Sequence, residues 1–186
     1  MYTRLLTFTG ATGIDAGVDY LREEALPILE AQRGFRGVSA SADRAGNLMS
    51  ILSLWETEAD RSASDSALGK AREEALKLVG GGLEIENFEE TVQVITKPPV
   101  AGCVLNVVRV RMEPASIERN IAWFTESIVP TITAHGATAM MAAAACKAAA
   151  GAKCSTSWPP ATAATIAAML NQSHCWLTKV PLCWSW

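Results

Sequence analysis

The sequence of 186 residues predicts an α+β fold whose strands and helices follow one another in the order βαββαβ. Three observations lead to this prediction. Residues 34–56 have the pattern of two strands joined by a short polar turn. A helical spacing of apolar residues stands on each side of that stretch, and a strand pattern begins and ends the series. We therefore expect residues 1–96 to form one unit.

The series begins with a strand and a helix. Residues 3–9 (TRLLTFT) have the pattern of a short strand, which Gly10 ends. From Ile14 to Leu29 apolar residues recur at helical spacing, with charged residues on the other faces. Pro27 lies inside this pattern and has no backbone N–H to donate. The helix should therefore kink or restart at Pro27.

The central stretch predicts a hairpin, with a first strand over residues 35–40, a turn over 43–47 and a second strand over 48–55. The second strand is largely apolar on both faces. A sheet with one face in water would alternate more cleanly between apolar and polar residues. We therefore expect a second sheet or another subunit to cover the face away from the helices.

A second helix is predicted over residues 56–78, with an acidic first turn that suits the positive end of the helix dipole. Its early part, residues 61–70, holds few apolar residues, which predicts a loose start. The three glycines at 80–82 are not followed by the Lys and Ser/Thr of a phosphate-binding loop, so we interpret them as a helix end and a hinge. A long acidic strand over 83–95 and a linker over 97–102 complete the series.

A second series begins after the linker, with a strand over residues 103–112 and a helix that starts near Glu113. At a shift of 103 residues the apolar positions of this helix match those of the first helix, and Pro130 falls on Pro27. A shared proline inside a helix is an unusual coincidence. We infer an internal duplication whose second copy opens over residues 103–134.

The match ends at His135, and residues 135–186 form an atypical tail. All 19 acidic residues lie before residue 127, whereas four of the five cysteines and four of the six tryptophans lie after it. Three interpretations stay open. A divergent tail would form an Ala-rich helix over 137–150 followed by disorder, and a shifted reading frame would give a degenerate second copy in a damaged gene product. The third is a metal site, whose ligands would be Cys146, Cys154, His174, Cys175 and Cys183. Their spacing is not that of a paired Cys-x-x-Cys knuckle, so we predict no metal.

Composition excludes several classes of function. The net charge of −3 argues against a nucleic-acid partner. No apolar run reaches the roughly 18–20 residues of a membrane span, and no signal peptide is recognisable. Five cysteines in a chain of this kind fit reduced thiols better than a disulfide framework. We therefore expect a cytoplasmic protein with neither a nucleic-acid nor a membrane partner.

Short motifs in residues 3–95 carry a resemblance to a known family. They are the helix with a late proline (ALPILEAQ), the Gly-Phe-Arg-Gly that opens the hairpin, and the strand that ends in Leu-Trp-Glu. With these motifs the stretch resembles the antibiotic-biosynthesis-monooxygenase-like families of the dimeric α+β barrel fold. The resemblance implies ferredoxin-like βαββαβ units that pack sheet to sheet around a pocket, either within one duplicated chain or as a homodimer. With an incomplete second repeat, we expect a homodimer.

The family includes cofactor-free quinone-forming oxygenases, haem-degrading oxygenases, isomerases and members with no known activity. Haem degraders use a histidine ligand, and this sequence has no histidine before His135, so haem degradation is disfavoured. The resemblance therefore implies a cofactor-independent monooxygenase-like protein that acts on an aromatic or quinone-type small molecule. The alternative is a non-catalytic ligand-binding or self-associating protein of the same fold.

Pocket candidates follow from the resemblance and from residue type. They are Phe35, Trp55, Asn106 and Arg109. The two aromatic residues could stack on a substrate or simply pack in the core, and Arg109 could stabilise an oxyanion or be a solvated strand residue. No Ser-His-Asp or Cys-His set can be built from the first 126 residues, so the sequence does not identify catalytic residues.

Overall fold

The computed structural model describes the backbone of residues 1–95, 103–112, 114–134, 139–146 and 164–173, and the side chains of residues 1–95 and 115–134. The chain divides into two compact units. The described part of unit 1 is Met1–Asn87, and that of unit 2 begins at Phe88.

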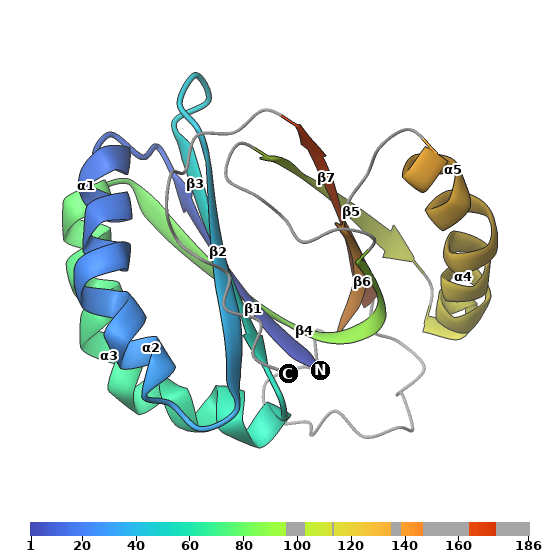
Figure 1. The fold of residues 1–186 in the computed structure, drawn as a ribbon, viewed down its shortest axis with the longest axis horizontal. Helices are drawn as coiled ribbons and strands as arrows, with labels where there is room; N and C mark the ends of the chain where they lie inside the picture. Colours follow the sequence, from blue (N-terminus) through green and yellow to red (C-terminus); the bar gives the residue numbers. More distant parts are fainter. Residues whose placement is uncertain (96–102, 113, 135–138, 147–163, 174–186) are drawn as a thin grey trace. The chain divides into compact units, whose positions relative to one another are not determined.

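Unit 1 is an α+β unit with the predicted βαββαβ order (Figure 1). Its strands lie in the order β2-β3-β1-β4, which is the order of a ferredoxin-like sheet, and both helical segments lie on one face of that sheet. The elements are β1 (Tyr2–Thr9), α1 (Ile14–Tyr20), the π-helical turn η1 (Leu21–Ala25), α2 (Leu26–Glu30), β2 (Phe35–Asp43), β3 (Leu48–Trp55), α3 (Glu58–Val79) and β4 (Gly82–Ile95), of which residues from Phe88 onward belong to unit 2. The predicted fold class is confirmed.

The first helix is interrupted just before its proline. In the π-helical turn η1, the N–H of Leu26 donates to the carbonyl of Leu21, five residues back. Pro27 follows as the second residue of α2, a place where its missing N–H and its ring are tolerated. The predicted restart is therefore confirmed, and a widened turn is the means of making it.

The hairpin forms as predicted. Strands β2 and β3 pair antiparallel up to Asp43 and Leu48. Between them Asn47 has a φ of 51°, and the N–H of Gly46 donates to Oδ1 of Asp43 at 2.9 Å. Asn and Asp are suited to such turns because a short polar side chain can replace a backbone partner.

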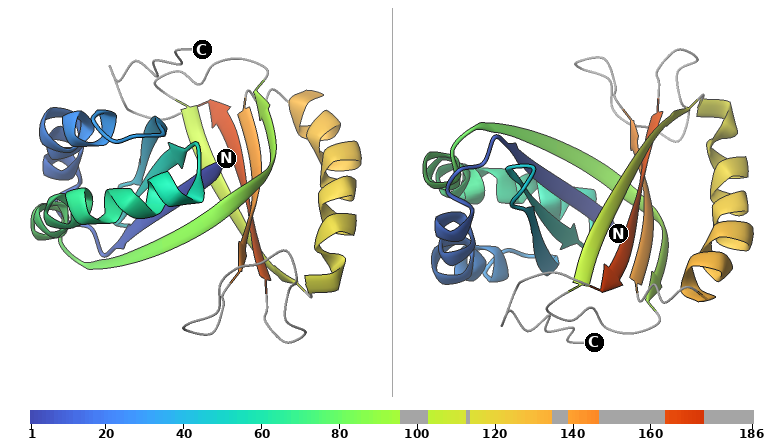
Figure 2. Two further views of the ribbon diagram at one scale, coloured as in Figure 1. Left: turned by 90° about the horizontal axis from the view of Figure 1, so that it is seen from below. Right: turned by 90° about the horizontal axis from the view of Figure 1, so that it is seen from above.

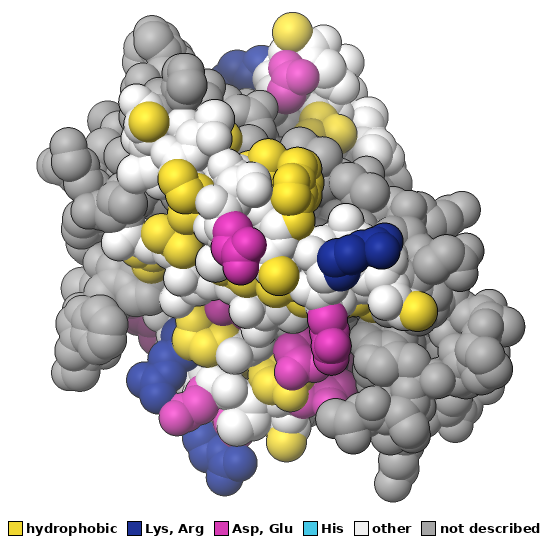
Figure 3. All heavy atoms as spheres, turned by 90° about the vertical axis from the view of Figure 1, so that its right-hand side faces the viewer, with side chains coloured by type: hydrophobic (Ala, Val, Ile, Leu, Met, Phe, Trp, Pro, Cys, Tyr) yellow, Lys and Arg dark blue, Asp and Glu magenta, His cyan; other side chains and the backbone are white. Residues whose placement is uncertain are grey.

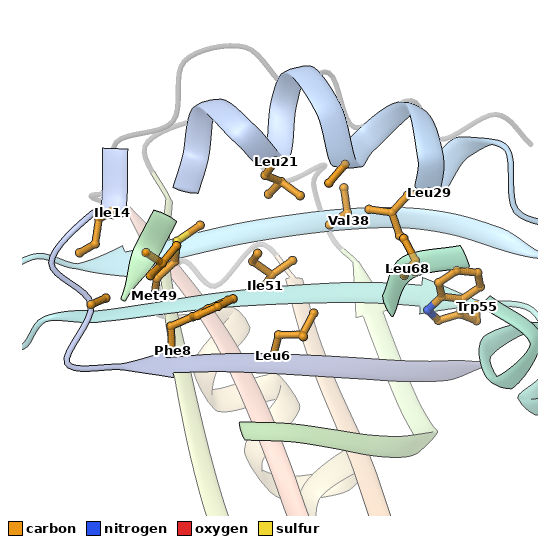
Figure 4. Packing of buried hydrophobic residues seen from close by; sticks show 13 residues of the cluster. Leu6, Phe8, Ile14, Leu21, Leu29, Val38, Met49, Ile51, Trp55 and Leu68 are labelled. Atoms are coloured by element: carbon orange, nitrogen blue, oxygen red, sulfur yellow. The ribbon is translucent and has the colours of Figure 1, made fainter. Parts of the chain in front are cut away.

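Both faces of β3 are buried, as its sequence predicts. On the face toward the helices, Met49, Ile51 and Trp55 join the core of unit 1 (Figure 4). On the other face, Leu52 and Leu54 are 7% and 6% exposed. This strand therefore does not have a solvated face.

Helix α3 is regular through residues 61–70, where the sequence predicted a loose start. Thr57 caps its beginning by accepting a hydrogen bond from the N–H of Asp60 at 3.0 Å. The buried side of this first half is largely polar, because Arg61 and Ser64 precede the first buried leucine, Leu68. The prediction of a loose start failed because it assumed that the buried side of a stable helix is apolar.

Unit 2 contains more regular structure than the sequence predicted. Its elements are β5 (Cys103–Met112), the 3₁₀ turn η2 (Pro114–Ser116), α4 (Ile117–Trp123), the π-helical turn η3 (Phe124–Ile128), α5 (Val129–Ala134), β6 (Ala139–Cys146) and β7 (Ala164–Ser173). Strand β5 pairs with β7, β7 with β6, and β6 with residues 89–95 of β4, all antiparallel. The expected Ala-rich helix over 137–150 is wrong, because residues 139–146 are a strand held between two partners.

The helical segment of unit 2 lies along one face of its sheet (Figure 2). Ile117 is buried there and packs with Val92 of β4 and with Ile121 and Phe124 of its own segment. The outer side of the segment exposes apolar and charged residues together, with Glu118, Glu126 and Trp123 among them (Figure 3).

Two further expectations concern the whole chain. None of the described helices is long and apolar enough to cross a membrane. Within the described residues, no group of three or more His, Cys, Asp and Glu side chains could hold a metal ion. Cys146 is the last residue of β6, and the other candidate ligands, Cys154, His174, Cys175 and Cys183, lie outside the described residues.

The turn from α3 to β4 depends on glycine. Gly80 and Gly81 both have a φ of +76°, and a Cβ on Gly81 would overlap the carbonyl oxygen of Thr9. Glycine adopts this backbone conformation without the steric cost that other residues incur. The same close approach places the end of β1 beside the start of β4.

We expect Gly81→Ala to lower the free energy of unfolding by about 1–3 kcal/mol, because it adds both backbone strain and a steric overlap. Gly69→Ala is the matched control, since Gly69 lies inside α3 with nothing within 4 Å of an added Cβ. This control should raise stability by about 0.5–1 kcal/mol. Urea unfolding measures both changes. An equal effect of the two substitutions would contradict the conclusion that the turn from α3 to β4 depends on Gly81.

Candidate ligand cavity

Unit 1 contains an apolar cavity of about 50 Å³ between its helices and its sheet. Strands β1 and β3 form its floor, and the first helical segment and α3 form its roof (Figure 4). The larger apolar lining residues are Leu6, Phe8, Leu21, Met49, Ile51 and Leu68. The cavity is therefore an extension of the core, and its walls are fixed by the same packing that stabilises the unit.

Four polar residues also line this cavity: Arg4, Tyr20, Ser53 and Arg72. Strand alternation places Arg4 on the same face of β1 as Leu6 and Phe8, and its side chain is only 2% exposed. A guanidinium buried in this way requires hydrogen-bond partners, since an isolated buried charge is very costly.

Helix α3 and strand β4 supply those partners. Nη2 of Arg4 donates to the carbonyl of Arg61 at 2.7 Å, and Nη1 donates to Oγ of Ser64 at 3.0 Å. Nε donates to Oδ1 of Asn87 at 3.3 Å. The polar first half of α3 therefore supplies hydrogen-bond acceptors for the Arg4 side chain.

One carboxylate is shared between two arginines. Oδ1 of Asp65 lies 2.9 Å from Nη2 of Arg4 and 2.7 Å from Nη1 of Arg72. Nη2 of Arg72 also donates to the backbone carbonyl of Asp65 at 2.9 Å. Because two guanidiniums share one carboxylate, this end of the cavity carries a net positive charge.

Burial lowers the pKa of Arg4 to about 10. Asp65 raises this pKa, while the neighbouring cations Arg72 and Arg61 lower it further. Arg4 is nevertheless a cation at neutral pH. The cavity therefore ends at a charged group held away from water, where an electrostatic interaction is stronger than at the surface.

The predicted pocket aromatics lie beside this cluster. The guanidinium carbon of Arg4 is 5.9 Å from the ring centroid of Trp55, and Phe35 meets Trp55 edge to face with centroids 5.5 Å apart. Nε1 of Trp55 donates to Oγ of Ser53 at 3.0 Å. Phe35 and Trp55 are thus brought together with each other and with Arg4, but neither is among the residues that line the cavity.

The other two predicted residues, Asn106 and Arg109, are on β5, where they pair with Leu170 and Ala167 of β7. Their side chains lie outside the described residues, so their predicted roles stay predictions.

The sequence analysis missed Arg4, Asp65 and Arg72. A signal was present, because Arg4 interrupts the apolar face of a strand and Ser64, Leu68 and Ala71 form one helical stripe.

The described lining offers few groups for proton transfer. It contains no His, Cys, Asp or Glu, and its titratable members are Arg4, Arg72 and Tyr20. Burial, together with Glu74 and Glu24, raises the pKa of the Tyr20 phenol, so Tyr20 stays protonated at neutral pH. The arrangement can bind an apolar ring and stabilise an anion, but no described lining group has the character of a general base.

Comparison with known proteins places this fold. No family model matches the chain. The uncharacterized proteins Rv2557 and Rv2558 of Mycobacterium tuberculosis (strain ATCC 25618 / H37Rv) are each 24% identical to it over 119 residues, or 64% of the chain. The match covers 53% and 50% of those proteins, so the chain spans about half the length of the relatives it matches.

Several solved structures match most of the chain. A protein from Lactobacillus acidophilus NCFM named "putative monooxygenase" has a TM-score of 0.63 at 11% identity, over 93% of this chain and 77% of its own. A second protein named "putative monooxygenase", from Fusobacterium nucleatum subsp. nucleatum ATCC 25586, has a TM-score of 0.63 at 8% identity, over 93% of this chain and 76% of its own. An "anthrone oxidase-like protein" has a TM-score of 0.60 at 11% identity, over 92% and 72%. The chain has the fold of these monooxygenase-like proteins. The ferredoxin-like α+β prediction is thereby confirmed.

Substitutions at Arg4 should separate the effect of its charge on the free energy of unfolding from the effect of its volume. We expect Arg4→Met to change the free energy of unfolding by less than about 1 kcal/mol, because an apolar chain of similar length replaces a buried ion. Two of its former partners keep others, since Asp65 still meets Arg72 and the Arg61 carbonyl still accepts from Ser64. Arg4→Ala, which also leaves a void, should cost about 2–4 kcal/mol.

Urea unfolding of both variants tests this expectation. Equal losses for Met and Ala would mean that the hydrogen bonds of Arg4 stabilise the fold, in contradiction to a role centred on the cavity.

Proposed function

We propose that this chain is a small cofactor-independent monooxygenase-like protein that acts on an aromatic or quinone-type molecule in the cavity of unit 1. The observation that carries the proposal is the apolar cavity with a buried, net positive arginine cluster at one end. The names of the fold neighbours, two of them "putative monooxygenase" and one "anthrone oxidase-like", support the same class of chemistry.

The proposed reaction is the oxidation of an electron-rich ring by O₂. In the keto form of a phenol the ring CH₂ group loses a proton, the resulting anion reacts with O₂, and elimination of water leaves a carbonyl. Each CH₂ group and O₂ thus give C=O and H₂O, with four electrons passing from carbon to oxygen. In this scheme Arg4 and Arg72 stabilise the anion, which is the species with electrons to donate.

A non-catalytic ligand-binding protein is the second candidate. The specific observation in its favour is the lack of a general base among the described lining residues. A substrate would therefore have to ionise without help from such a group. If no turnover accompanies binding, the ligand-binding function is the one to retain.

The repeat and the assembly also belong to the proposal. The π-helical turns η1 and η3 begin at Leu21 and Phe124, which is the same shift of 103 residues that aligns Pro27 with Pro130. This agreement supports a tandem duplication, with a first copy over residues 1–96 and a second copy from residue 103 onward. The homodimer, the cytoplasmic location and the out-of-frame origin of residues 135–186 remain predictions, although β6 and β7 supply strands that an out-of-frame tail would not be expected to contain.

Oxygen consumption tests the function directly. The purified chain is mixed with anthrone and with hydroquinones of one and two rings, and O₂ uptake is compared with that of buffer alone. Quinone formation that matches the O₂ consumed would support the monooxygenase. Saturable binding without O₂ uptake would support the binding protein and contradict the enzyme.

A pair of substitutions on α3 locates the reaction. Ala71 lines the cavity and is buried, whereas Ala67 is exposed on the same helix. We expect Ala71→Leu to fill the cavity and to reduce binding or turnover at least about tenfold, which corresponds to about 1.4 kcal/mol. Ala67→Leu should leave both unchanged. Equal activity in the two variants would place the site elsewhere.

A further inference from the structure

We propose that the ligand of unit 1 is a single aromatic ring that carries an ionised hydroxyl, a phenolate, bound through the remaining N–H of Arg4. This inference rests on the proposed function, because it names the class of molecule that the same cavity would take. It is carried by the size of the cavity and by the hydrogen-bond inventory of Arg4.

The cavity volume fits a ligand of about one ring. A volume of about 50 Å³ accommodates about three to five water-sized positions, since each needs about 10–15 Å³ in this measure. One six-membered ring is of that size. Three fused rings would require displacement of wall residues such as Phe8, Met49 and Leu68, which are 1%, 0% and 7% exposed and belong to the core.

Arg4 has one donor left for a ligand. A guanidinium has five N–H groups. Nε uses its N–H on Asn87, Nη2 uses both on the Arg61 carbonyl and Asp65, and Nη1 uses one on Ser64. Within the part of the chain that the structure describes, the second N–H of Nη1 therefore has no hydrogen-bond partner, although Arg4 lines the cavity and is 2% exposed.

The charge of the cluster favours an anion at that donor. Asp65 is the carboxylate shared by Arg4 and Arg72, and its side chain is 53% exposed, so its neutralising effect is partly screened by water. Arg61, 7% exposed, is also nearby; its Nη2 pairs with Glu58, which is 56% exposed, and its Nε has no partner among the described residues. A phenolate oxygen would gain a charge-assisted hydrogen bond there, whereas an ether of the same shape would not.

A matched pair of probes tests this directly. 4-Nitrophenol is ionised at mildly alkaline pH and has one ring, and 4-nitroanisole is its uncharged methyl ether. We expect titration calorimetry to show the phenolate binding about tenfold to a hundredfold more tightly than the ether. Bound nitrophenol should also ionise at a lower pH than free nitrophenol, which its yellow absorbance reports.

Two variants assign the effect to Arg4. Arg4→Met should remove the preference for the phenolate, so that the two probes bind with similar affinities. Arg36→Met is the control, because Arg36 is an exposed arginine of β2 paired with Glu56 and absent from the cavity lining. This control should bind both probes as the unchanged chain does. Thermal unfolding of each variant establishes that it is folded before its affinity is read.

The outcomes separate this inference from the proposed function. Equal affinities for the two probes, or a phenolate preference that survives Arg4→Met, would overturn the inference, and so would tighter binding of anthrone than of the single ring. Oxygen uptake with such a ligand would still uphold the oxygenase. Phenolate binding that depends on Arg4, without oxygen uptake on any quinol, would uphold the inference and reject the enzyme.

Discussion

The buried guanidinium of Arg4 is the constraint on which much of unit 1 depends. A charge held 2% exposed on the helix-facing side of a strand must be given hydrogen bonds by whatever packs above it. The first half of α3 meets that requirement with the Arg61 carbonyl, Ser64 and Asp65. Trp55 lies against the same group from β3. The polar residues on the buried side of this helix segment are therefore explained by the guanidinium whose hydrogen bonds they accept.

Sequence patterns predicted the elements of unit 1 because each depends on local chemistry. Alternation identified β3, helical spacing identified the first helix, and Pro27 marked its interruption. These patterns failed where pairing with residues distant in the sequence decides the structure. Alanine is the best helix former, so residues 137–150 indicated a helix, but pairing of β6 with β4 and β7 overrides that preference.

The site was missed for a related reason: Arg4 and Asp65 lie about 60 residues apart, and no local pattern shows that one carboxylate serves Arg4 and Arg72. Trp55 was noticed, yet it supports Arg4 instead of lining the cavity.

The cavity combines two properties that rarely occur together in a core. Its walls are apolar, which favours a ring, and one end carries a net positive charge. The cation is already desolvated and positioned in the folded chain, so a ligand anion would not have to reorganise it. Such preorganisation serves binding and oxidation equally. The two functions differ in whether the bound anion meets O₂, and the fold, shared with monooxygenase-like proteins, is compatible with both.

Nitrogen-15 NMR of the arginine side chains tests the central claim most directly. We expect an Arg4 Nε–H signal that exchanges slowly with water and shifts when 4-nitrophenolate is added. Arg36, whose side chain is 45% exposed and pairs with Glu56 through Nη2, provides the rapidly exchanging reference in the same spectrum. An Arg4 signal that exchanges as fast as that of Arg36, and that does not move when the phenolate is added, would contradict a buried cation at the end of a ligand cavity.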